Sequence, residues 1–366
     1  MKTPNNHPLP NPDQSTALRV VPGVDSYSST NTNIPTAAPK KQDLSAEAYA
    51  EGILSGDRGL LSRAITIIES NAPKHFELGR EIVNLVLSHA GNSVRLGITG
   101  VPGAGKSTTI EALGMHLCGL GKKVAVLAVD PSSALSGGSI LGDKTRMEKL
   151  SRHPSAFIRP SPSGGTLGGV TRKSREIIAL CEAAGFDVIV VETVGVGQSE
   201  IAVHSMVDFF LVLAITGAGD ELQGIKKGII EMADAILINK ADGDNREKAH
   251  AARAEYNQVL HYLRTNTEDW ETKAYAASAL TGEGIAEIWQ VVSEFIQITR
   301  KSGALARRRA AQSVSWVRRT AEDYVIRKTF DDPNIKSVMN EIEHLLKTGD
   351  ISPAAALKRV IDEIEN

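Results

Sequence analysis

Gly100-Val101-Pro102-Gly103-Ala104-Gly105-Lys106-Ser107 is the stretch that decides the fold of this chain. It matches the Walker A pattern, G-x-x-x-x-G-K-[ST], a glycine-rich turn between a strand and a helix. Residues 93–99 are an apolar run that predicts the strand, and residues 108–120 predict the helix. A turn of this composition arises by chance in about one chain of this length in a hundred. The two flanking elements therefore favour a true phosphate-binding loop.

The residue types of this loop suit a polyphosphate. Glycines let the backbone curl around the phosphates, and the loop N–H groups and the positive end of the helix face the anion. Lys106 adds a positive charge between the outer phosphates, and the Ser107 hydroxyl can bind Mg²⁺. The predicted phosphate-binding residues are Gly100, Val101, Pro102, Gly103, Ala104, Gly105, Lys106, Ser107 and Thr108.

Composition sets limits on the class of protein. The 366 residues carry a net charge of -2, so no global field favours nucleic acid, and no run approaches the ~20 apolar residues that span a bilayer. The basic run at residues 307–309 is interpreted as a solvated helix face. Cys118 and Cys181 lie far apart in apolar helical patterns and are interpreted as reduced core residues. We expect a cytoplasmic protein with no membrane or nucleic-acid partner, the mitochondrial matrix being the alternative.

The chain divides into four predicted parts. Residues 1–42 are rich in Pro, Asn, Thr and Ser and predict a disordered tail; one arginine beside Asp13 and Asp25 argues against a mitochondrial presequence. Residues 43–91 predict a helical segment, residues 92–301 a P-loop domain and residues 302–366 a helical arm. The expected helices of the two outer parts cover residues 48–55, 58–71, 76–89, 305–329, 334–347 and 353–364. The apolar faces of the last three pack on the domain's flank or on a second copy, and we favour the second copy.

The middle part predicts an α/β fold with a mostly parallel sheet flanked by helices. Apolar runs typical of buried parallel strands lie at residues 123–129, 188–191, 209–215, 235–238 and 273–277. Residues 131–146 predict a functional loop beside the nucleotide site. Residues 160–169 predict a second, flexible loop followed by a helix at 171–184, and residues 216–228 predict a further mobile segment. A helix at residues 285–301 closes this part.

Acids follow two of these strands. Asp130 stands at the end of the first run after the P-loop, where ligands collect in open α/β sheets. Glu192 follows the next run and precedes Gly195, the expected form of a γ-phosphate sensor. There the acid holds Mg²⁺ and the glycine N–H touches the phosphate.

Asn239-Lys240-Ala241-Asp242 matches the guanine-recognition pattern N-K-x-D. The Asp242 carboxylate can accept both N–H groups on one edge of guanine, and adenine has no such pair of donors. A site built for those bonds rejects a base that lacks them by roughly 10⁴-fold. Polar residues of an ordinary loop are the alternative. Further on, Ser278, Ala279 and Leu280 follow the last predicted strand and are expected beside the base.

With these motifs in place, the chain resembles the MeaB/ArgK family, the methylmalonyl-CoA mutase-associated GTPases of the SIMIBI class. The resemblance covers all but the tail. It rests on residues 100–109 (GVPGAGKSTT), 129–133 (VDPSS), 142–147 (GDKTRM), 192–200 (ETVGVGQSE), 217–227 (GAGDELQGIKK) and 239–242.

The resemblance implies a GTP-hydrolysing chaperone that loads, protects or reactivates an adenosylcobalamin-dependent acyl-CoA mutase and is a homodimer through its C-terminal helices. It implies GTP, GDP and Mg²⁺ as ligands, with cobalamin met only through the mutase. Carried over by position, Asp130, Asp143 and Glu192 would surround the metal with Ser107, and Lys106 and Lys226 would join them in catalysis. Val196 stands where Ras-like GTPases have a water-positioning glutamine, so we expect slow hydrolysis by the chain alone.

Three alternatives remain. A kinase or ATPase of basic amino-acid transport, a label that this family has also carried, predicts ATP preference, against which residues 239–242 argue. A nickel-inserting GTPase of the same class would require a His/Cys cluster, and the nine histidines show no ligand spacing. A non-enzymatic scaffold would leave both halves of the nucleotide site without a purpose.

Overall fold

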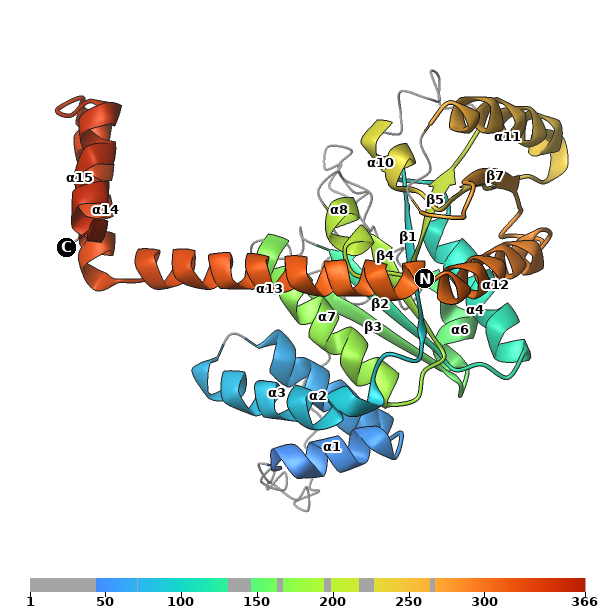
Figure 1. Cartoon of the computed structure of the whole chain (residues 1–366), viewed down its shortest axis with the longest axis horizontal. Coiled ribbons are helices and arrows are strands. Elements are labelled where there is room, and N and C mark those ends of the chain that lie inside the picture. The colour runs from blue at the N-terminus through green and yellow to red at the C-terminus, as the bar shows by residue number, and fades with distance from the viewer. Residues whose placement is uncertain are drawn as a thin grey trace, which may run out of the picture. The chain divides into compact units, whose positions relative to one another are not determined.

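Seven parallel strands form one sheet in the order β3-β2-β4-β1-β5-β6-β7 (Figure 1). The computed structural model describes residues 44–70, 72–130, 146–162, 167–193, 199–216, 227–263 and 267–365. The strands are β1 Val94–Gly100, β2 Val124–Asp130, β3 Ala156–Pro162, β4 Val188–Thr193, β5 Phe209–Ala214, β6 Ala235–Ile238 and β7 Lys273–Ala276. Every pairing between neighbouring strands is parallel. The predicted α/β class with a parallel P-loop sheet flanked by helices is confirmed.

Helices bury both faces of the sheet, which is why its central strands are continuously apolar. Successive residues of β5 point to opposite faces: Phe209 belongs to one hydrophobic cluster and Phe210 to the other. Phe209 packs edge-on against Phe295 with ring centroids 5.0 Å apart. The helices between the strands are α4 Lys106–Gly119, α6 Glu148–Arg152, α7 Leu167–Ala183, α8 Ser199–His204, α10 Lys227–Met232 and α11 Arg246–His261, and α12 Ile285–Lys301 follows the last strand.

Three helices precede the sheet, close to where the sequence predicts them. They are α1 Ala46–Leu54, α2 Arg58–Glu69 and α3 Pro73–Val86, the last continued by a 3₁₀ turn at Leu87–His89. The side chain of Asp57 caps α2 by accepting from two backbone N–H groups at 2.7 and 2.9 Å. Arg159 of β3 pairs with Glu69 of α2 and so ties this helical segment to the sheet.

One predicted loop is wrong in part. The loop expected at residues 160–169 overlaps β3 at its start and α7 at its end, and α7 begins four residues before the predicted helix. Two prolines, Pro160 and Pro162, hid the strand, because proline cannot donate to a ladder and argues against a central strand. An edge strand tolerates it, and β3 pairs only with β2.

The chain ends in α13 Ala304–Phe330, α14 Pro333–Thr348 and α15 Pro353–Glu365, as predicted to within a residue or two. The interpretation of residues 307–309 as a solvated face is wrong for two of the three arginines. Arg308 makes a two-pronged bond to the Asp234 carboxylate at 2.9 Å, and the side chain of Asp234 is 1% exposed. Arg309 grips the buried Asp208 in the same way at 2.6 and 2.7 Å. The run meets acids that immediately precede β5 and β6, a relationship that sequence spacing does not reveal.

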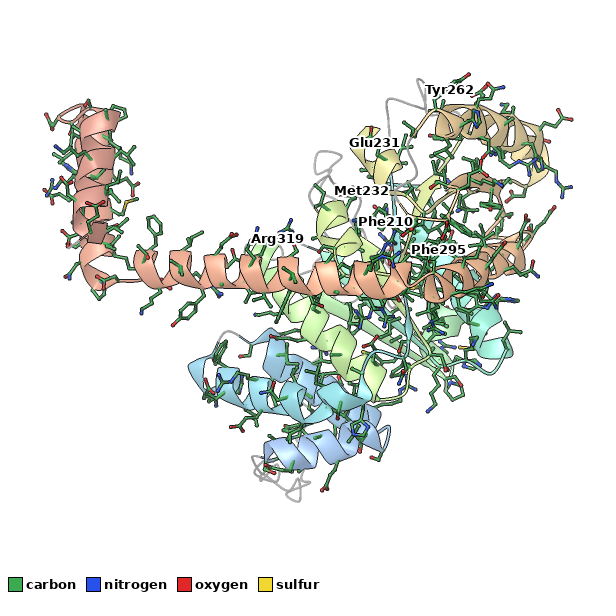
Figure 2. All side chains as sticks on the ribbon, in the orientation of Figure 1. Phe210, Glu231, Met232, Tyr262, Phe295 and Arg319 are labelled. Carbon is green, nitrogen blue, oxygen red and sulfur yellow. The ribbon has the colours of Figure 1, made fainter. Side chains whose placement is uncertain are left out.

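Beyond Gln312, α13 exposes an apolar series (Figure 2). Its members are Val314, Val317, Tyr324, Val325, Ile326 and Phe330. The start of α13 thus packs on the flank of the domain. Packing of the remainder of α13 against a second copy of the chain, which the sequence favours, stays a prediction.

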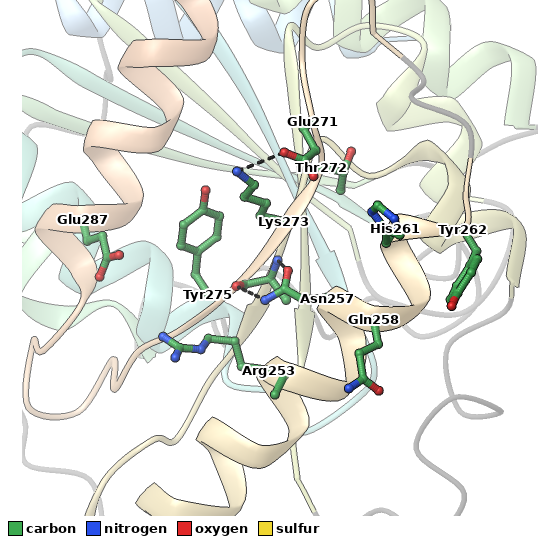
Figure 3. Close-up of a pocket in the computed structure, with 12 residues that line it drawn as sticks. Arg253, Asn257, Gln258, His261, Tyr262, Glu271, Thr272, Lys273, Tyr275 and Glu287 are labelled. Carbon is green, nitrogen blue, oxygen red and sulfur yellow. Dashed lines mark hydrogen bonds and ion pairs between the residues drawn. The ribbon is translucent and has the colours of Figure 1, made fainter.

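The outer edge of β7 is closed by a side chain. Asn257 of α11 accepts from the Ala274 N–H at 2.8 Å and donates to the Ala274 carbonyl at 3.2 Å, so its carboxamide replaces a neighbouring strand (Figure 3). Around it lies an open pocket of about 890 Å³ between α11 and β7, which also includes Arg253, Lys273 and Tyr275.

Candidate functional site

The P-loop joins the carboxyl end of β1 to α4. It requires glycine where it passes closest to the 239–242 segment. Gly105 has φ 85°, and a Cβ there would lie 2.5 Å from the Asn239 side-chain nitrogen. Gly100, at φ 151°, has the Leu213 backbone in the position that a Cβ would fill. Any larger residue at Gly105 would push the loop away from the 239–242 segment.

Lys106 opens α4 and lies across its own loop. Its ammonium donates to the Gly100 carbonyl at 2.8 Å and lies 3.4 Å from that of Val101. Burial lowers the pKa of Lys106, and the carboxylates of Glu192 and Glu200 act in the opposite direction. The acids therefore help to keep the lysine charged in a partly buried position, as phosphate binding needs.

The Walker A hydroxyl meets the predicted sensor acid. Ser107 Oγ donates to Glu192 Oε1 at 3.1 Å, across 85 positions of sequence, and Glu192 is only 8% exposed. Glu192 lies within β4, one residue before Thr193, whose hydroxyl lies 2.6 Å from that of Thr99 in β1. Oxygen atoms of this kind, held close together, are what Mg²⁺ prefers, so the residues present fit the predicted metal.

The other predicted metal and sensor residues are placed less completely. Asp130 is the last residue of β2, and its predecessor pairs with Thr193 of β4, so its backbone lies at the same edge of the sheet. Asp143, Gly195 and Lys226 lie outside the described residues. Within the described ranges, no three His, Cys, Asp or Glu side chains cluster as a metal site.

Asn239 connects the two halves of the site. Its side-chain N–H donates to the Ala104 carbonyl in the P-loop at 2.8 Å, and its side-chain oxygen accepts from the Ala279 N–H at 3.1 Å. The residue is 1% exposed and directly follows β6. One buried amide therefore holds the phosphate loop and the 278–280 segment in fixed register.

The acid of the N-K-x-D motif is held by a hydroxyl. Ser278 Oγ donates to Asp242 and itself accepts from the Thr281 N–H at 3.1 Å. Lys240 has a left-handed backbone conformation, with φ 61°, which turns the chain between Asn239 and Asp242. Leu280 is 82% exposed at the end of this segment. The predicted guanine-binding residues are thus brought together at one edge of the sheet.

Sequence reasoning missed two features of this site. Neither the bond from Ser278 to Asp242 nor the position of Glu200, 2% exposed and acting on Lys106, was predicted. A hydroxyl just after the last strand, and an acid in the ETVGVGQSE run, were the available signals.

Comparison with known proteins places the chain among its relatives. The sequence model of the family described as "Methylmalonyl Co-A mutase-associated GTPase MeaB" matches residues 61–334. The chain belongs to the MeaB family. It is accordingly a P-loop GTPase that binds guanine nucleotide.

MeaB relatives resemble nearly the whole chain. The GTPase ArgK of Escherichia coli is 47% identical over 85% of this chain and 94% of its own length. The mitochondrial methylmalonic aciduria type A homolog of Mus musculus is 46% identical over 83% of this chain and 76% of its own length. A solved structure named LAO/AO transport system kinase is 40% identical, covers 88% of this chain and 98% of its own, and superposes with a TM-score of 0.70. None of the helices within the described residues has the length and apolar character to span a membrane.

Proposed function

We propose that this GTPase assembles with an adenosylcobalamin-dependent acyl-CoA mutase and gates the loading, protection or reactivation of its cofactor. The family description names methylmalonyl-CoA mutase, and the mouse relative is named for methylmalonic aciduria. Cobalamin meets this chain only through the mutase, and the chain acts in the cytoplasm.

The observation that carries the proposal is the Asn239 bridge. A buried amide that binds the P-loop at one end and the 278–280 segment at the other makes phosphate binding and base binding interdependent. This coupling supports a site that recognises guanine nucleotide as a whole, and the response to GDP or GTP falls to the residues proposed around the γ-phosphate. In the proposed site, the Asp242 carboxylate, oriented by Ser278, accepts the two N–H donors of guanine.

The phosphates bind to the loop N–H groups of residues 100–108, and Lys106 turns from the loop carbonyls to the outer phosphate oxygens. Glu192, within reach of Ser107, together with Asp130 and Asp143, orients the metal and its waters. Mg²⁺, when bound, neutralises charge that develops on the transferred phosphoryl group. In the proposed site, Gly195 senses the γ-phosphate. Lys226 makes a contact that differs between the GDP and GTP states.

The proposed division of the chain follows these roles. Residues 1–42 are a tail, residues 43–91 a helical lead-in, residues 92–301 the GTPase domain and residues 302–366 an arm through which two copies dimerise. The exposed apolar series of α13 and the exposed Leu346 and Leu357 of α14 and α15 support a second copy as the partner of the arm.

The test is capture of purified mutases by the immobilised chain in GDP and in a non-hydrolysable GTP analogue. We expect association that depends on the nucleotide with at least one adenosylcobalamin-dependent acyl-CoA mutase. Equal capture, or no capture, of every such mutase in both nucleotides would overturn the proposal.

A second candidate is an ATPase or kinase of basic amino-acid transport, favoured by the name of the 40%-identical solved structure. It predicts that ATP binds at least as tightly as GTP and that a partner protein becomes phosphorylated. Calorimetry with the two nucleotides separates the candidates, because Asp242 complements guanine and not adenine.

A further inference from the structure

The short helix α8 touches the nucleotide site at one end and the C-terminal arm at the other. It spans Ser199–His204, between β4 and β5, and contacts α7, which in turn packs on α13 (Figure 1). Because the helix has fewer than two turns, a displacement at one end moves the other end with it.

The carboxyl end of α8 is held by α13 and α7. Gln312 of α13 donates its side-chain N–H to the His204 carbonyl at 3.2 Å and to the Val207 carbonyl at 2.8 Å. Arg175 of α7 donates to the Ser205 carbonyl at 2.6 Å. The His204 carbonyl is one of those that a helix leaves without a partner at its end, so Gln312 of α13 caps α8 and also holds the turn that follows it.

At its other end, α8 follows β4, which carries Glu192, and it contacts both β4 and β1, the strand that leads into the P-loop. Glu200, its second residue, is 2% exposed, and its charge acts on the Lys106 ammonium. When Lys106 turns toward a bound phosphate, the charge opposite Glu200 moves. The position of α8 is therefore sensitive to what Lys106 binds.

The junction of α7, α8 and α13 is incompletely hydrogen-bonded among the described residues. Three buried polar atoms there lack a hydrogen-bond partner among the described residues: Gln312 Oε1, Trp316 Nε1 and Arg175 Nε. One is an acceptor and two are donors, so they are complementary in kind. Buried polar groups are almost always satisfied, so a rearrangement of Gln312 that satisfies one of these atoms would offset part of the cost of giving up its bonds to the His204 and Val207 carbonyls.

We propose that α8 and Gln312 form a relay through which the nucleotide at the P-loop sets how tightly α13 is attached to the GTPase domain. The relay rests on the proposed function and adds its regulation: the arm responds to GDP or GTP, and occupation of the arm changes nucleotide affinity by the same factor.

The test compares the full chain with Gln312→Met, which keeps the side-chain volume and removes both bonds to α8. Ser313→Ala is the matched control, since the Ser313 hydroxyl bonds only within α13, to the Arg309 carbonyl at 2.8 Å. Amide hydrogen exchange is followed in peptides covering residues 199–207 and 304–316, in GDP and in a non-hydrolysable GTP analogue. Calorimetry gives both affinities, and thermal unfolding checks that each variant is folded.

In the wild type and in Ser313→Ala, we expect both peptides to change protection together when the analogue replaces GDP. In Gln312→Met, residues 199–207 still respond and residues 304–316 do not, and the ratio of GDP to analogue affinities shifts by about 5-fold or more. If Gln312→Met unfolds, Gln312→Glu, which keeps one acceptor and removes the donor, takes its place.

A failed relay and a failed function give different results. Absence of GTP binding would overturn the proposed function and the relay with it. GTP binding with unchanged protection at residues 304–316 in the wild type, or with the same response in Gln312→Met, would overturn the relay alone.

Discussion

The Asn239 side chain donates a hydrogen bond of 2.8 Å to the Ala104 carbonyl, 135 positions earlier in the chain. The bond is buried and joins the loop expected to hold phosphates to the motif expected to read the base. The same carboxamide fills the space in which Gly105 would carry a side chain.

Replacing Asn239 should weaken binding at both ends of the nucleotide. Asn239→Ala leaves the Ala104 carbonyl and the Ala279 N–H without a partner, and each such buried group costs about 1–3 kcal/mol. We expect GTP and GDP affinities to fall together by about tenfold or more by calorimetry. Asn239→Asp keeps the acceptor for Ala279 but buries a carboxylate against the Ala104 carbonyl, so its affinities should fall at least as far as those of the alanine variant. A loss confined to one nucleotide would contradict the bridge.

Replacing Asp242 should abolish base selection and spare phosphate binding. In Asp242→Ala, we expect the preference for GTP over ATP to fall by about 10²-fold or more. Asp242→Asn should favour xanthosine triphosphate, because xanthine presents a carbonyl where guanine has its amine and an amide can donate to it. Ser278→Ala removes the bond that orients the carboxylate, together with the bond from the Thr281 N–H, and should cost about tenfold in GTP affinity. Unchanged selectivity in Asp242→Ala would rule out this acid as the base reader.

GTP hydrolysis by the chain alone should be slow. Val196 lies outside the described residues, and its apolar side chain cannot orient a water as glutamine does. A transition-state charge supplied by a partner is worth about 10³- to 10⁵-fold, so addition of the correct mutase should raise the rate of phosphate release. Phosphate release measured with and without mutase checks this. A high rate without partner would contradict it.

The Arg308–Asp234 pair should be a major source of stability. Arg308→Met leaves the Asp234 carboxylate buried without its cation, which is expected to lower the free energy of unfolding by about 3–5 kcal/mol. Arg307→Met is the control, because its partner Glu268 is well exposed and such pairs contribute about 1 kcal/mol at most. Urea denaturation of both variants measures the difference. Equal losses of unfolding free energy in the two variants would show that the burial of Asp234 does not make its ion pair stronger.

Asn257 should protect the sheet edge. Asn257→Ala frees the N–H and carbonyl of Ala274 on the outer side of β7, which should lower the unfolding free energy by about 1–2 kcal/mol and promote association through the exposed edge. Gln258→Ala, an exposed neighbour on α11, is the control. Light scattering and urea denaturation provide the two readouts. A monodisperse, fully stable Asn257→Ala protein would show that the edge needs no cover.

Much of the fold was predictable because burial leaves a local signal. The β5 and β6 strands are unbroken apolar runs, β4 is apolar up to Glu192, and α12 was predicted to the residue. The β3 strand was not predicted, because two prolines in seven residues suppress the signal and only its edge position permits them. The short α8 and α10 also went unpredicted, since six residues do not separate a helix from a loop. The polar α11 was missed although its buried Ala249, Ala252, Tyr256 and Leu260 recur at helical spacing.

The site was predictable where a motif lies in one stretch and unpredictable where distant residues meet. The P-loop and residues 239–242 were identified, and their assigned roles stay predictions. The bridge made by Asn239, the bond from Ser278 to Asp242 and the burial of Arg308 depend on contacts between residues from 36 to 135 positions apart. No spacing rule contains such contacts, because the topology of the sheet creates them.

The anchor of the arm and the proposed nucleotide site lie at opposite ends of the strands. Arg308 and Arg309 hold acids that precede β5 and β6, at the amino ends of the strands, and the P-loop and Asp242 follow the carboxyl ends. The path by which GDP would leave and GTP would enter therefore does not cross the Arg308 and Arg309 anchor, and any influence of the nucleotide on the arm has to pass through the body of the domain.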